Sequence, residues 1–570
     1  MISEGGMGFR QSDEWEHLPL KAASSIILKS SGPLMQGKLW EEISSDEDGY
    51  RDKLTIVVSV NDLRRTSARI SRGLSWDTTL RHVINELQAG NALERLTHCR
   101  HLIVSFGSEA ALWIHFGDPS GAAHASFLFD PGVIEGDHAL SVQGTAFGLQ
   151  SCLTAAVANA VCRDKTPNLE TGCEGGLSAM YNLLQQGHGP ATEATSGFPA
   201  ERLAKDIRHP SHRYSRARFT FPDSELPTSW SVLSESAKTS HTSGASDIPF
   251  ETARLVALRG PIALENLPSV RVGHLLSVDR YETEALRALM NQMRNYRDHD
   301  SGSKPLSIGV FGPPGSGKSF GVKQMATEIC GKNGWLEFNL SQFASTDDLI
   351  GAFHQIRDCV LRQIIPVAFF DEFDSQKLKW LQYLLAPMQD GKFQEGKLTH
   401  PIGKCIFVFA GGTSWTFDSF GPHEKASTSA HEEFRHAKGP DFKSRLDGYL
   451  NVIGPNQKKT LIPDGDGYEP GPPDLTDVCF PIRRALMLRS ELRCDENAKL
   501  DMDEGILEAI LHAKEFTHGS RSLSKILQPF KNGTTGPFYK SALPPLSQIG
   551  MHTDVDEFLK NCNSSTTPTS

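Results

Sequence analysis

A glycine-rich stretch that ends in a lysine and a hydroxyl residue is the part of this sequence best suited to chemistry. Residues 312–319 fit the G-x-x-x-x-G-K-[ST] pattern of a phosphate-binding loop, or P-loop. Their glycines let the backbone curl so that several N–H groups point at one anion. We expect Lys318 to reach the β- and γ-phosphates of ATP and Ser319 to hold Mg²⁺. The predicted nucleotide-binding residues are Gly312, Pro313, Pro314, Gly315, Ser316, Gly317, Lys318 and Ser319.

Two carboxylates follow an apolar run further along the chain. The run Ile364–Phe370 is followed directly by Asp371 and Glu372. Such a run predicts a buried parallel strand whose carboxyl end brings both acids to the phosphate site. Asp371 would then bind Mg²⁺ together with Ser319, and Glu372 would polarise the attacking water. The alternative is a strand followed by an ordinary acidic turn.

The next apolar run also ends in small polar residues. Residues 404–410 predict a strand that leads into Gly411, Gly412, Thr413 and Ser414. With the P-loop and the acidic pair, this order resembles the AAA+ ATPases, in which the corresponding strand ends in a polar group called sensor 1. The resemblance implies that Thr413 fills this role, with Ser414 as the alternative.

Two arginines are assigned roles by the same resemblance. Phe442-Lys-Ser-Arg445-Leu is similar to the arginine finger of Clp-type unfoldases, which implies that Arg445 reaches the γ-phosphate of a neighbouring subunit. A guanidinium suits this role because it contacts phosphoryl oxygens bidentately. Gly519-Ser-Arg521 resembles the sensor 2 helix of those proteins, so Arg521 would lean from a lid onto the nucleotide. Arg483 and Arg484, at another predicted helix start, compete for this role.

The resemblance covers approximately residues 270–530, and the subfamily stays open. Residues 382–393 resemble a stretch found in other AAA+ clades, such as the enhancer-binding activators. A pore loop that grips polypeptide requires an aromatic residue between the P-loop helix and the acidic strand. Residues 351–353, Gly-Ala-Phe, are the candidate, and a helix boundary is the alternative.

Composition is that of a soluble intracellular protein. The chain of 570 residues is 38% hydrophobic, with a net charge of −10, which gives no reason to expect binding to nucleic acid. The N-terminus has no apolar signal core, and no apolar run is long enough to span a membrane. Ten cysteines are scattered without a C-x-x-C pair. We therefore expect a cytoplasmic protein without membrane contact.

Before the P-loop, the pattern predicts a second α/β region. Strands are expected at residues 54–60, 102–106, 111–116 and 126–129, and a helix at residues 76–87. The order of elements faintly resembles ribokinase-type sugar kinases, in which a glycine-rich turn opens a helix and supplies a catalytic aspartate. Here the turn is Gly144-Thr-Ala-Phe147, and Thr145 stands where the aspartate would be. A hydroxyl is a poor proton acceptor near pH 7, although a helix beginning at Gly144 could still bind an anion.

Composition shifts divide the chain. A short basic stretch that contains Arg216 and Arg218 is interpreted as a solvated linker face. The predicted regions are an N-terminal polar segment (1–50), an α/β accessory domain (51–190), a linker-like segment (191–265), an AAA+ core (266–460), a helical lid (461–531) and a disordered tail (532–570).

The expected fold class is α/β, with a P-loop AAA+ core built on a parallel sheet, a small helical lid and a separate N-terminal α/β domain. The expected function is Mg²⁺-dependent ATP hydrolysis by a homo-oligomeric ring that remodels an unknown protein client. Two alternatives stay open. One is a nucleotide-controlled switch or scaffold that does not thread polypeptide. The other is a small-molecule kinase in the N-terminal domain, regulated by the ATPase.

Overall fold

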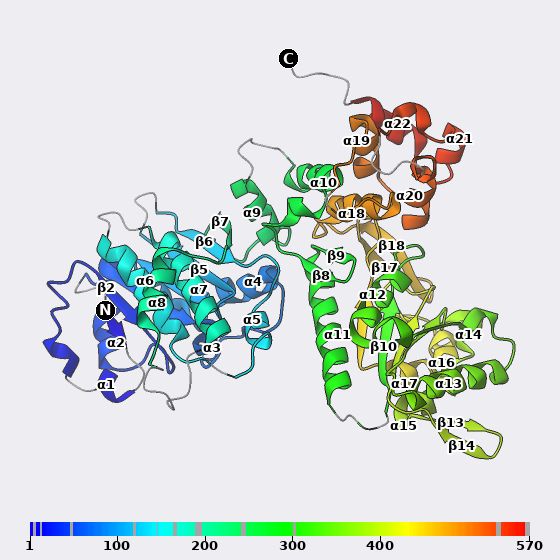
Figure 1. The fold of residues 1–570 in the computed structure, drawn as a ribbon, viewed down its shortest axis with the longest axis horizontal. Helices are drawn as coiled ribbons and strands as arrows, with labels where there is room; N and C mark the ends of the chain where they lie inside the picture. Colours follow the sequence, from blue (N-terminus) through cyan, green and yellow to red (C-terminus); the bar gives the residue numbers. More distant parts are fainter. Residues whose placement is uncertain are drawn as a thin grey trace. The chain divides into compact units, whose positions relative to one another are not determined.

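The protein folds into two compact units, each described here by itself (Figure 1). The computed structural model describes all residues except 4–6, 12–13, 46–48, 118–120, 145, 164–167, 188–196, 241–246, 300–301, 303, 497, 532–536 and 565–570. Unit 1 comprises Met1–Ile248 and Leu264–Ser269. Unit 2 comprises Pro249–Ala263 and Val270–Ser570.

Unit 1 is built on a seven-stranded sheet whose strands follow chain order. The first four strands are parallel and the last three are antiparallel. The strands are β1 (Ile2–Ser3), β2 (Ile26–Lys29), β3 (Leu54–Ser59), β4 (His101–Phe106), β5 (Ala110–His115), β6 (His124–Phe129) and β7 (Ser215–Thr220). The strands expected between residues 54 and 129 are confirmed as β3 to β6.

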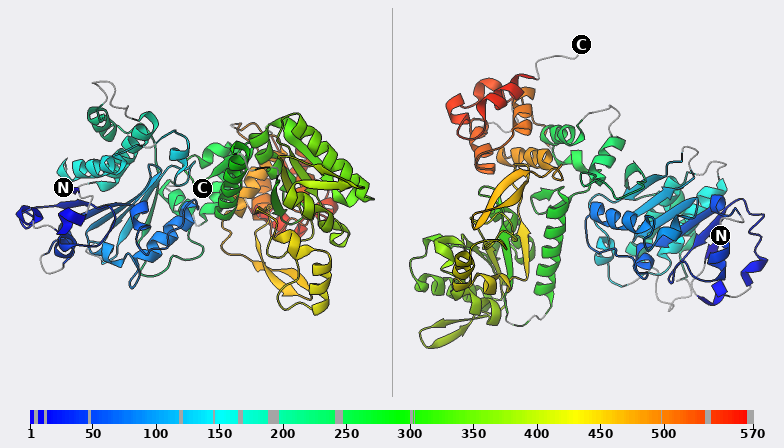
Figure 2. Two further views of the ribbon diagram at one scale, coloured as in Figure 1. Left: turned by 90° about the horizontal axis from the view of Figure 1, so that it is seen from below. Right: turned by 180° about the vertical axis from the view of Figure 1, so that it is seen from behind.

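Helices cover both faces of this sheet (Figure 2). Alternate side chains of a strand face opposite sides, so Ile56 and Val58 join one apolar cluster and Val57 joins the other. The first cluster includes residues of α2 (Lys38–Ile43) and α4 (Trp76–Leu87), and the second includes residues of α6 (Leu149–Arg163), α7 (Leu169–Gln186) and α8 (Ala200–Arg208). Shorter helices are α1 (Met7–Gln11), α3 (Val60–Leu63), α5 (Asp137–Leu140) and α9 (Val232–Ser240).

Two segments expected to lie outside a domain supply elements of unit 1. Residues 1–50 supply β1, β2 and α2, because the short apolar run of β2 is buried in the sheet. Within the expected linker at 191–265, α8, β7 and α9 belong to unit 1, whereas the next helix, α10 (Ile248–Arg259), lies in unit 2 from Pro249 onward. The basic stretch within it is not a solvated linker face: Arg216 forms an ion pair with Glu174, and Arg218 with Glu170, both on α7. Polar composition was misleading because a strand paired on one edge needs few apolar residues.

The expected anion-binding helix at Gly144 is wrong. Helix α6 begins at Leu149, five residues later, and residue 144 lies in an irregular segment. Thr145, which stands at the position of the kinase aspartate, lies outside the described residues.

Unit 2 contains a five-stranded parallel sheet in the order β11-β12-β15-β10-β16. Its strands are β10 (Leu306–Phe311), β11 (Trp335–Asn339), β12 (Val367–Asp371), β15 (Ile406–Ala410) and β16 (Gly448–Asn451). Alternate residues of β12 again divide between two cores: Phe369 packs with α11 (Arg280–Asp298) and α12 (Lys318–Cys330), and Phe370 packs with α13 (Thr346–Leu361) and α15 (Leu381–Asp390). The fold class expected from the sequence, a parallel P-loop core after a separate α/β domain, is confirmed.

Short hairpins and helices complete this core. The hairpins are β8 (Val270–Val272) with β9 (Leu275–Ser277), β13 (Lys392–Glu395) with β14 (Leu398–Pro401), and β17 (Lys459–Asp464) with β18 (Gly467–Pro473). The additional helices are α14 (Ser375–Leu378), α16 (Thr428–His436) and α17 (Gly439–Lys443).

A helical lid follows the core, and it is larger than expected. It contains α18 (Phe480–Glu491), α19 (Glu504–His512) and α20 (Ser520–Ile526), and α10 (Ile248–Arg259) packs against it through Phe250 and His512. The expected disordered tail includes α21 (Leu546–Ile549) and α22 (Val555–Ser564), and α22 packs on α19. The tail folds because a few apolar residues, among them Ile549 and Phe558, are buried against the lid.

The proposed pore-loop stretch is neither a loop nor a helix boundary. Residues 351–353 lie inside α13, and the side chain of Phe353 is only 2% exposed. Among the residues that the structure describes, no helix is long and apolar enough to cross a bilayer.

Candidate nucleotide site

Three loops leave the unit 2 sheet side by side at the carboxyl ends of β12, β15 and β10. The register pairs Asp371 with Ala410, and Ala410 with Val310, so these strands end at the same level. The carboxyl ends of these strands therefore bring together three segments: the acidic pair, the segment beginning at Gly411 and the P-loop. In open parallel sheets, ligands bind at the carboxyl ends of the strands.

The P-loop backbone requires glycine at several positions. Gly315 and Gly317 have φ of 74° and 92°, in the left-handed region that disfavours other residues. A Cβ atom at Gly315 would also lie 2.3 Å from the carbonyl oxygen of His518, and one at Gly312 would lie 2.6 Å from that of Val452. These glycines let the loop curl while it packs against neighbouring backbone.

Lys318 is the first residue of α12 and folds back over the loop. Its Nζ donates to the carbonyl oxygens of Gly312 at 2.8 Å and Pro313 at 3.3 Å. Burial lowers the pKa of Lys318, and the charges of Asp371 and Asp374 oppose this effect. The ammonium is thus held against the loop on the side that faces the carboxylates.

The acidic pair lies at the end of β12: Asp371 is the last residue of the strand and Glu372 begins the turn that follows. Glu372 has a positive φ of 52°, and its backbone N–H donates to Asp371 Oδ1 at 3.1 Å. Burial raises the pKa of Asp371, while this N–H and Lys318 act in the opposite direction. The Glu372 side chain is exposed, so the turn presents one carboxylate within the site and one facing solvent.

Asp374 is a member of this site that sequence reasoning missed. Its buried carboxylate accepts the N–H groups of Gly412 at 3.0 Å and Thr413 at 2.8 Å, together with the Thr413 hydroxyl. Asp374 therefore fixes the loop after β15 relative to the acidic turn. The available signal was the third acid of the run Asp-Glu-Phe-Asp, but its partner lies 39 residues away in the sequence.

The lid contacts the P-loop through the start of α20. The N–H of Ser520 donates to the carbonyl oxygen of Gly315 at 2.8 Å. Arg521, the next residue, is exposed, and its charge is one of the causes that lower the pKa of Lys318. The structure thus brings Arg521 close to Lys318.

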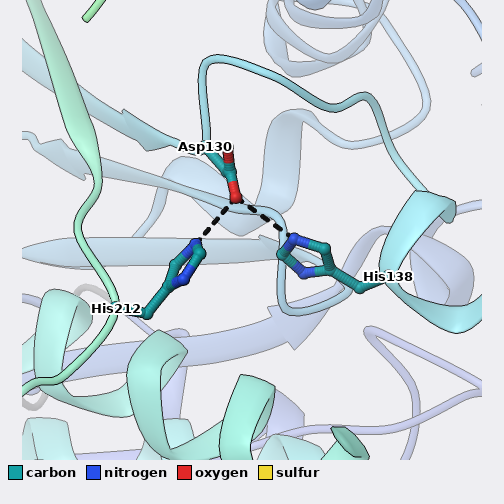
Figure 3. A group of neighbouring side chains, drawn as sticks. All are labelled: Asp130, His138 and His212. Carbon is teal, nitrogen blue, oxygen red and sulfur yellow. Dashed lines mark hydrogen bonds and ion pairs between the residues drawn. The ribbon is translucent and has the colours of Figure 1, made fainter. Parts of the chain in front are cut away.

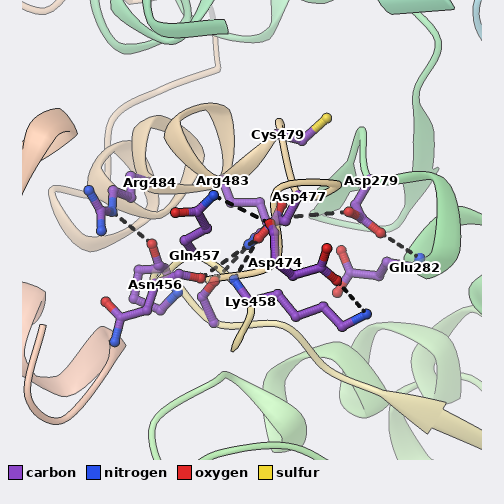
Figure 4. A network of polar contacts seen from close by, with 12 residues as sticks. Asp279, Glu282, Asn456, Gln457, Lys458, Asp474, Asp477, Cys479, Arg483 and Arg484 are labelled. Atoms are coloured by element: carbon purple, nitrogen blue, oxygen red, sulfur yellow. Dashed lines mark hydrogen bonds and ion pairs between the residues drawn. The ribbon is translucent and has the colours of Figure 1, made fainter. Parts of the chain in front are cut away.

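The two competing arginines point elsewhere (Figure 4). Arg483 donates to both carboxylate oxygens of Asp477 at 2.7 Å and is 4% exposed. Arg484, also buried, donates to the backbone carbonyls of Pro455 and Leu511. Both side chains are occupied in fastening α18 of the lid to neighbouring segments of unit 2.

Arg445 lies away from the P-loop of its own chain. Its Nε donates to Gln389 Oε1 at 3.0 Å and its Nη1 to the carbonyl oxygen of Asp441 at 2.6 Å. It precedes β16, whose first residue pairs with Ile308 near the start of β10. Asp447, between Arg445 and β16, accepts the N–H of Ser307 at 2.9 Å, so Arg445 lies toward the amino ends of the strands, whereas the P-loop follows the carboxyl end of β10.

The residues present fit ATP and Mg²⁺. Gly317 gives α12 no side-chain cap, so the N–H groups of its first turn are available to an anion. The buried Ser316 Oγ has no hydrogen-bond partner among the described residues. Ser319 and Asp371 offer only oxygen donors, which Mg²⁺ prefers.

A comparison with protein-family models found a match for one segment of unit 2. Residues 308–409 match the family model described as the AAA domain (dynein-related subfamily). The segment contains the P-loop, Asp371 and Glu372, so it is a P-loop nucleotide-binding domain of a class that generally hydrolyses ATP. Thr413, Arg445 and Arg521 lie beyond it.

A solved structure of NtrX from Brucella abortus is similar at 13% identity and a TM-score of 0.30, over 49% of this chain and 56% of that chain. The chain therefore spans a little over half of that protein's length. A search of curated proteins found no match.

Proposed function

We propose that this protein hydrolyses ATP with Mg²⁺ at the interfaces of a homo-oligomer and uses the cycle to remodel a protein partner. The observation that carries this proposal is the placement of charged groups on the unit 2 sheet. Lys318, Asp371 and Glu372 gather at the carboxyl ends of the strands, and Arg445 lies toward the amino ends. A complete site then needs a second subunit to supply the arginine.

Binding would rest on the P-loop and its surroundings. Backbone N–H groups from Gly315 to Ser319 surround the phosphates, and Lys318 exchanges its loop carbonyls for the β- and γ-phosphates. Mg²⁺, held by Ser319 and Asp371, would neutralise charge on the phosphate oxygens. Arg521 reaches the nucleotide from the lid, so that lid position follows nucleotide occupancy.

Hydrolysis would be performed by side chains at the same ends of the strands. Glu372, exposed on its left-handed turn, orients and polarises the attacking water. Thr413, positioned by Asp374, contacts the γ-phosphate side. Arg445 of a neighbouring subunit stabilises the charge of the transition state, which is worth ~10³-fold or more in rate.

The first experiment separates binding from turnover. Lys318→Ala should lower ATP affinity steeply, because the cation over the phosphates is lost. Glu372→Gln keeps the size and the metal geometry and loses only the charge that polarises water. It should bind ATP and fail to hydrolyse it, as measured by fluorescent-nucleotide titration and phosphate release. Turnover by Glu372→Gln at the wild-type rate would contradict the assignment of the acidic strand.

The second experiment tests shared catalysis. Arg445→Ala should leave nucleotide binding intact and abolish turnover. Mixed with Lys318→Ala, which keeps a normal finger, it should regain part of the activity at interfaces that combine a normal pocket with a normal finger. The ATPase rate is measured against mixing ratio at concentrations that support assembly. Absence of any activity above that of the two parents would favour a site completed within one chain.

A nucleotide-controlled switch is the second candidate, and one observation favours it. Phe353 is buried in α13, and from Gly321 to Asp371, where every residue is described, no aromatic side chain is exposed. A machine that threads polypeptide needs such a group in this region. Capture of clients by Glu372→Gln loaded with ATP separates the two: a remodeller retains unfolded clients, and a switch retains a folded partner or none.

A further inference from the structure

A cluster of side chains that could bind a metal lies in unit 1, and none of its residues belongs to the candidate nucleotide site. Asp130, His138 and His212 each offer one ligand atom, and these atoms lie within 4.8 Å of one another (Figure 3). Asp130 Oδ2 lies 3.2 Å from His138 Nε2 and 2.7 Å from His212 Nε2. We propose that these three residues form a binding site for a divalent transition-metal ion of the zinc class.

Sheet pairing brings the three residues together from distant parts of the chain. Phe129 at the end of β6 pairs with Ser215 at the start of β7, so the residues flanking these two meet at one edge. Asp130 follows directly after β6, and His212 lies three residues before β7. His138 comes from α5, which begins seven residues after Asp130. The convergence is therefore fixed by backbone pairing and not by flexible side chains alone.

The histidine rings are held in place from behind. His138 Nδ1 contacts the hydroxyl of buried Ser108 at 2.9 Å, which leaves Nε2 directed at the carboxylate of Asp130. Tyr181 of α7 stacks on His212 with ring centroids 4.2 Å apart, and its ring also packs against His138. Metal-binding histidines typically use their second nitrogen in this way, because the outer contact fixes the tautomer and the ring orientation.

The donor set indicates the class of ion. Imidazole nitrogens favour zinc and its neighbours in the first transition row, whereas Mg²⁺ and Ca²⁺ prefer sites built entirely from oxygen. With metal–ligand bonds of about 2.1 Å, tetrahedral ligands lie about 3.4 Å apart. The Asp130–His138 separation, at 3.2 Å, is near this value, and the Asp130–His212 separation of 2.7 Å must lengthen by about 0.7 Å.

The cluster is partly open to solvent. The side chain of His138 is 7% exposed, that of Asp130 is 15% and that of His212 is 23%. Three protein ligands with access from one side leave at least one coordination position for water or a small ligand. A zinc site that serves only structure usually has four protein ligands, so this set resembles sites that keep an exchangeable position.

The test uses the full-length protein, stripped with a chelator and freed of nucleotide and Mg²⁺. Zn²⁺ is titrated by calorimetry, and Co²⁺ is added as an absorption probe. We expect one equivalent to bind and a Co²⁺ spectrum without thiolate charge-transfer bands. His212→Asn and Asp130→Asn should each abolish this equivalent. The matched control is His209→Asn, which removes an exposed imidazole three residues from His212 and should leave binding unchanged.

A further variant tests the outer contact. Ser108→Ala should weaken Zn²⁺ binding by about 10- to 100-fold, the usual cost of losing a partner that orients a ligating histidine. The filled Ser108→Ala site should still show imidazole ligands by X-ray absorption.

Two results would overturn the proposal. One is wild-type protein that takes up no equivalent of Zn²⁺ or Co²⁺, in which case the cluster is a carboxylate hydrogen-bonded to two histidines. The other is an equivalent that survives both His212→Asn and Asp130→Asn. Should these variants fail to fold, X-ray absorption of wild-type protein decides: a zinc shell without imidazole scattering counts against the site.

Discussion

The nucleotide site and the junction between core and lid are both built from charged side chains of unit 2, yet their surroundings differ. At the nucleotide site, Glu372, Ser319 and Arg521 are exposed, and Lys318 rests on loop carbonyls that a phosphate can replace. At the junction, Arg483 is buried and held by Asp477 in a two-point contact (Figure 4). Charges reserved for a ligand are left accessible, and charges that hold the fold together are paired and buried. Variants at the junction should therefore change stability, and variants at the nucleotide site should change turnover.

The largest expected effect on stability is at Arg483. Arg483→Met leaves Asp477 buried without its partner, which typically costs about 3–5 kcal/mol. We expect the free energy of unfolding of unit 2 to fall by this amount, measured by denaturant titration with hydrogen exchange to locate the change. Arg435→Met, on the exposed surface of α16, is the control and should change little. A loss below 1 kcal/mol at Arg483 would remove the distinction between the two clusters.

A pH-dependent effect is expected at Glu282 in the same junction. Burial raises the pKa of Glu282 to about 7, Asp279 adds to the rise, and Ser277 and Arg483 oppose it. Because the folded state holds the proton more tightly, the stabilisation is complete below about pH 4.5 and is lost as pH rises to about 7. The loss amounts to about 3 kcal/mol.

Glu282→Gln should remove this dependence, since an amide stays neutral throughout. The measurement is the free energy of unfolding of both proteins as a function of pH, from about pH 5 to about pH 8. Parallel curves for the wild type and the variant would show that Glu282 is ionised in the folded protein.

An intermediate effect is expected at Asp374. This residue lies at the nucleotide site, but its carboxylate is buried and hydrogen-bonded like the charges of the junction. Asp374→Asn keeps the size but weakens the charge-assisted bonds to Gly412 and Thr413, each worth about 1.5–3 kcal/mol. Stability should fall by about 1–2 kcal/mol and turnover by roughly tenfold, because the loop after β15 loses its fixed position. Asp390→Asn, at the exposed end of α15, serves as control. Unchanged turnover would exclude a role for this loop in hydrolysis.

The smallest expected effect on stability is at Arg521. Arg521→Ala removes an exposed side chain, so the free energy of unfolding should change by less than about 0.5 kcal/mol. ATP affinity should nevertheless fall several-fold, because a cation near the phosphates is lost. Lys525→Ala, one turn further along α20, should change neither quantity. Equal nucleotide affinities for the two variants would rule out Arg521 as the lid residue that senses nucleotide.

Sequence reasoning succeeded best where structure is local. The strand–loop–helix around the P-loop and the helix Trp76–Leu87 were predicted closely, because glycine spacing and apolar periodicity are contiguous signals. It failed for β1, β2, β7 and α22, which are short or polar and are stabilised by the elements on which they pack. Segments of this kind have the composition of linkers and tails.

What the sequence determined by itself is the phosphate-binding loop, the acidic strand and the α/β class, because each depends on residues adjacent in the chain. Only the tertiary structure decided which arginines are available for chemistry, since Arg483 and Arg521 differ in burial and partners and not in residue type. The tertiary structure also places Asp374 in contact with the loop that contains Thr413, and it brings Asp130 into contact with His212, which lies 82 residues further along the chain. Such contacts arise from strand pairing and packing, which bring distant residues together in ways that residue spacing does not reveal.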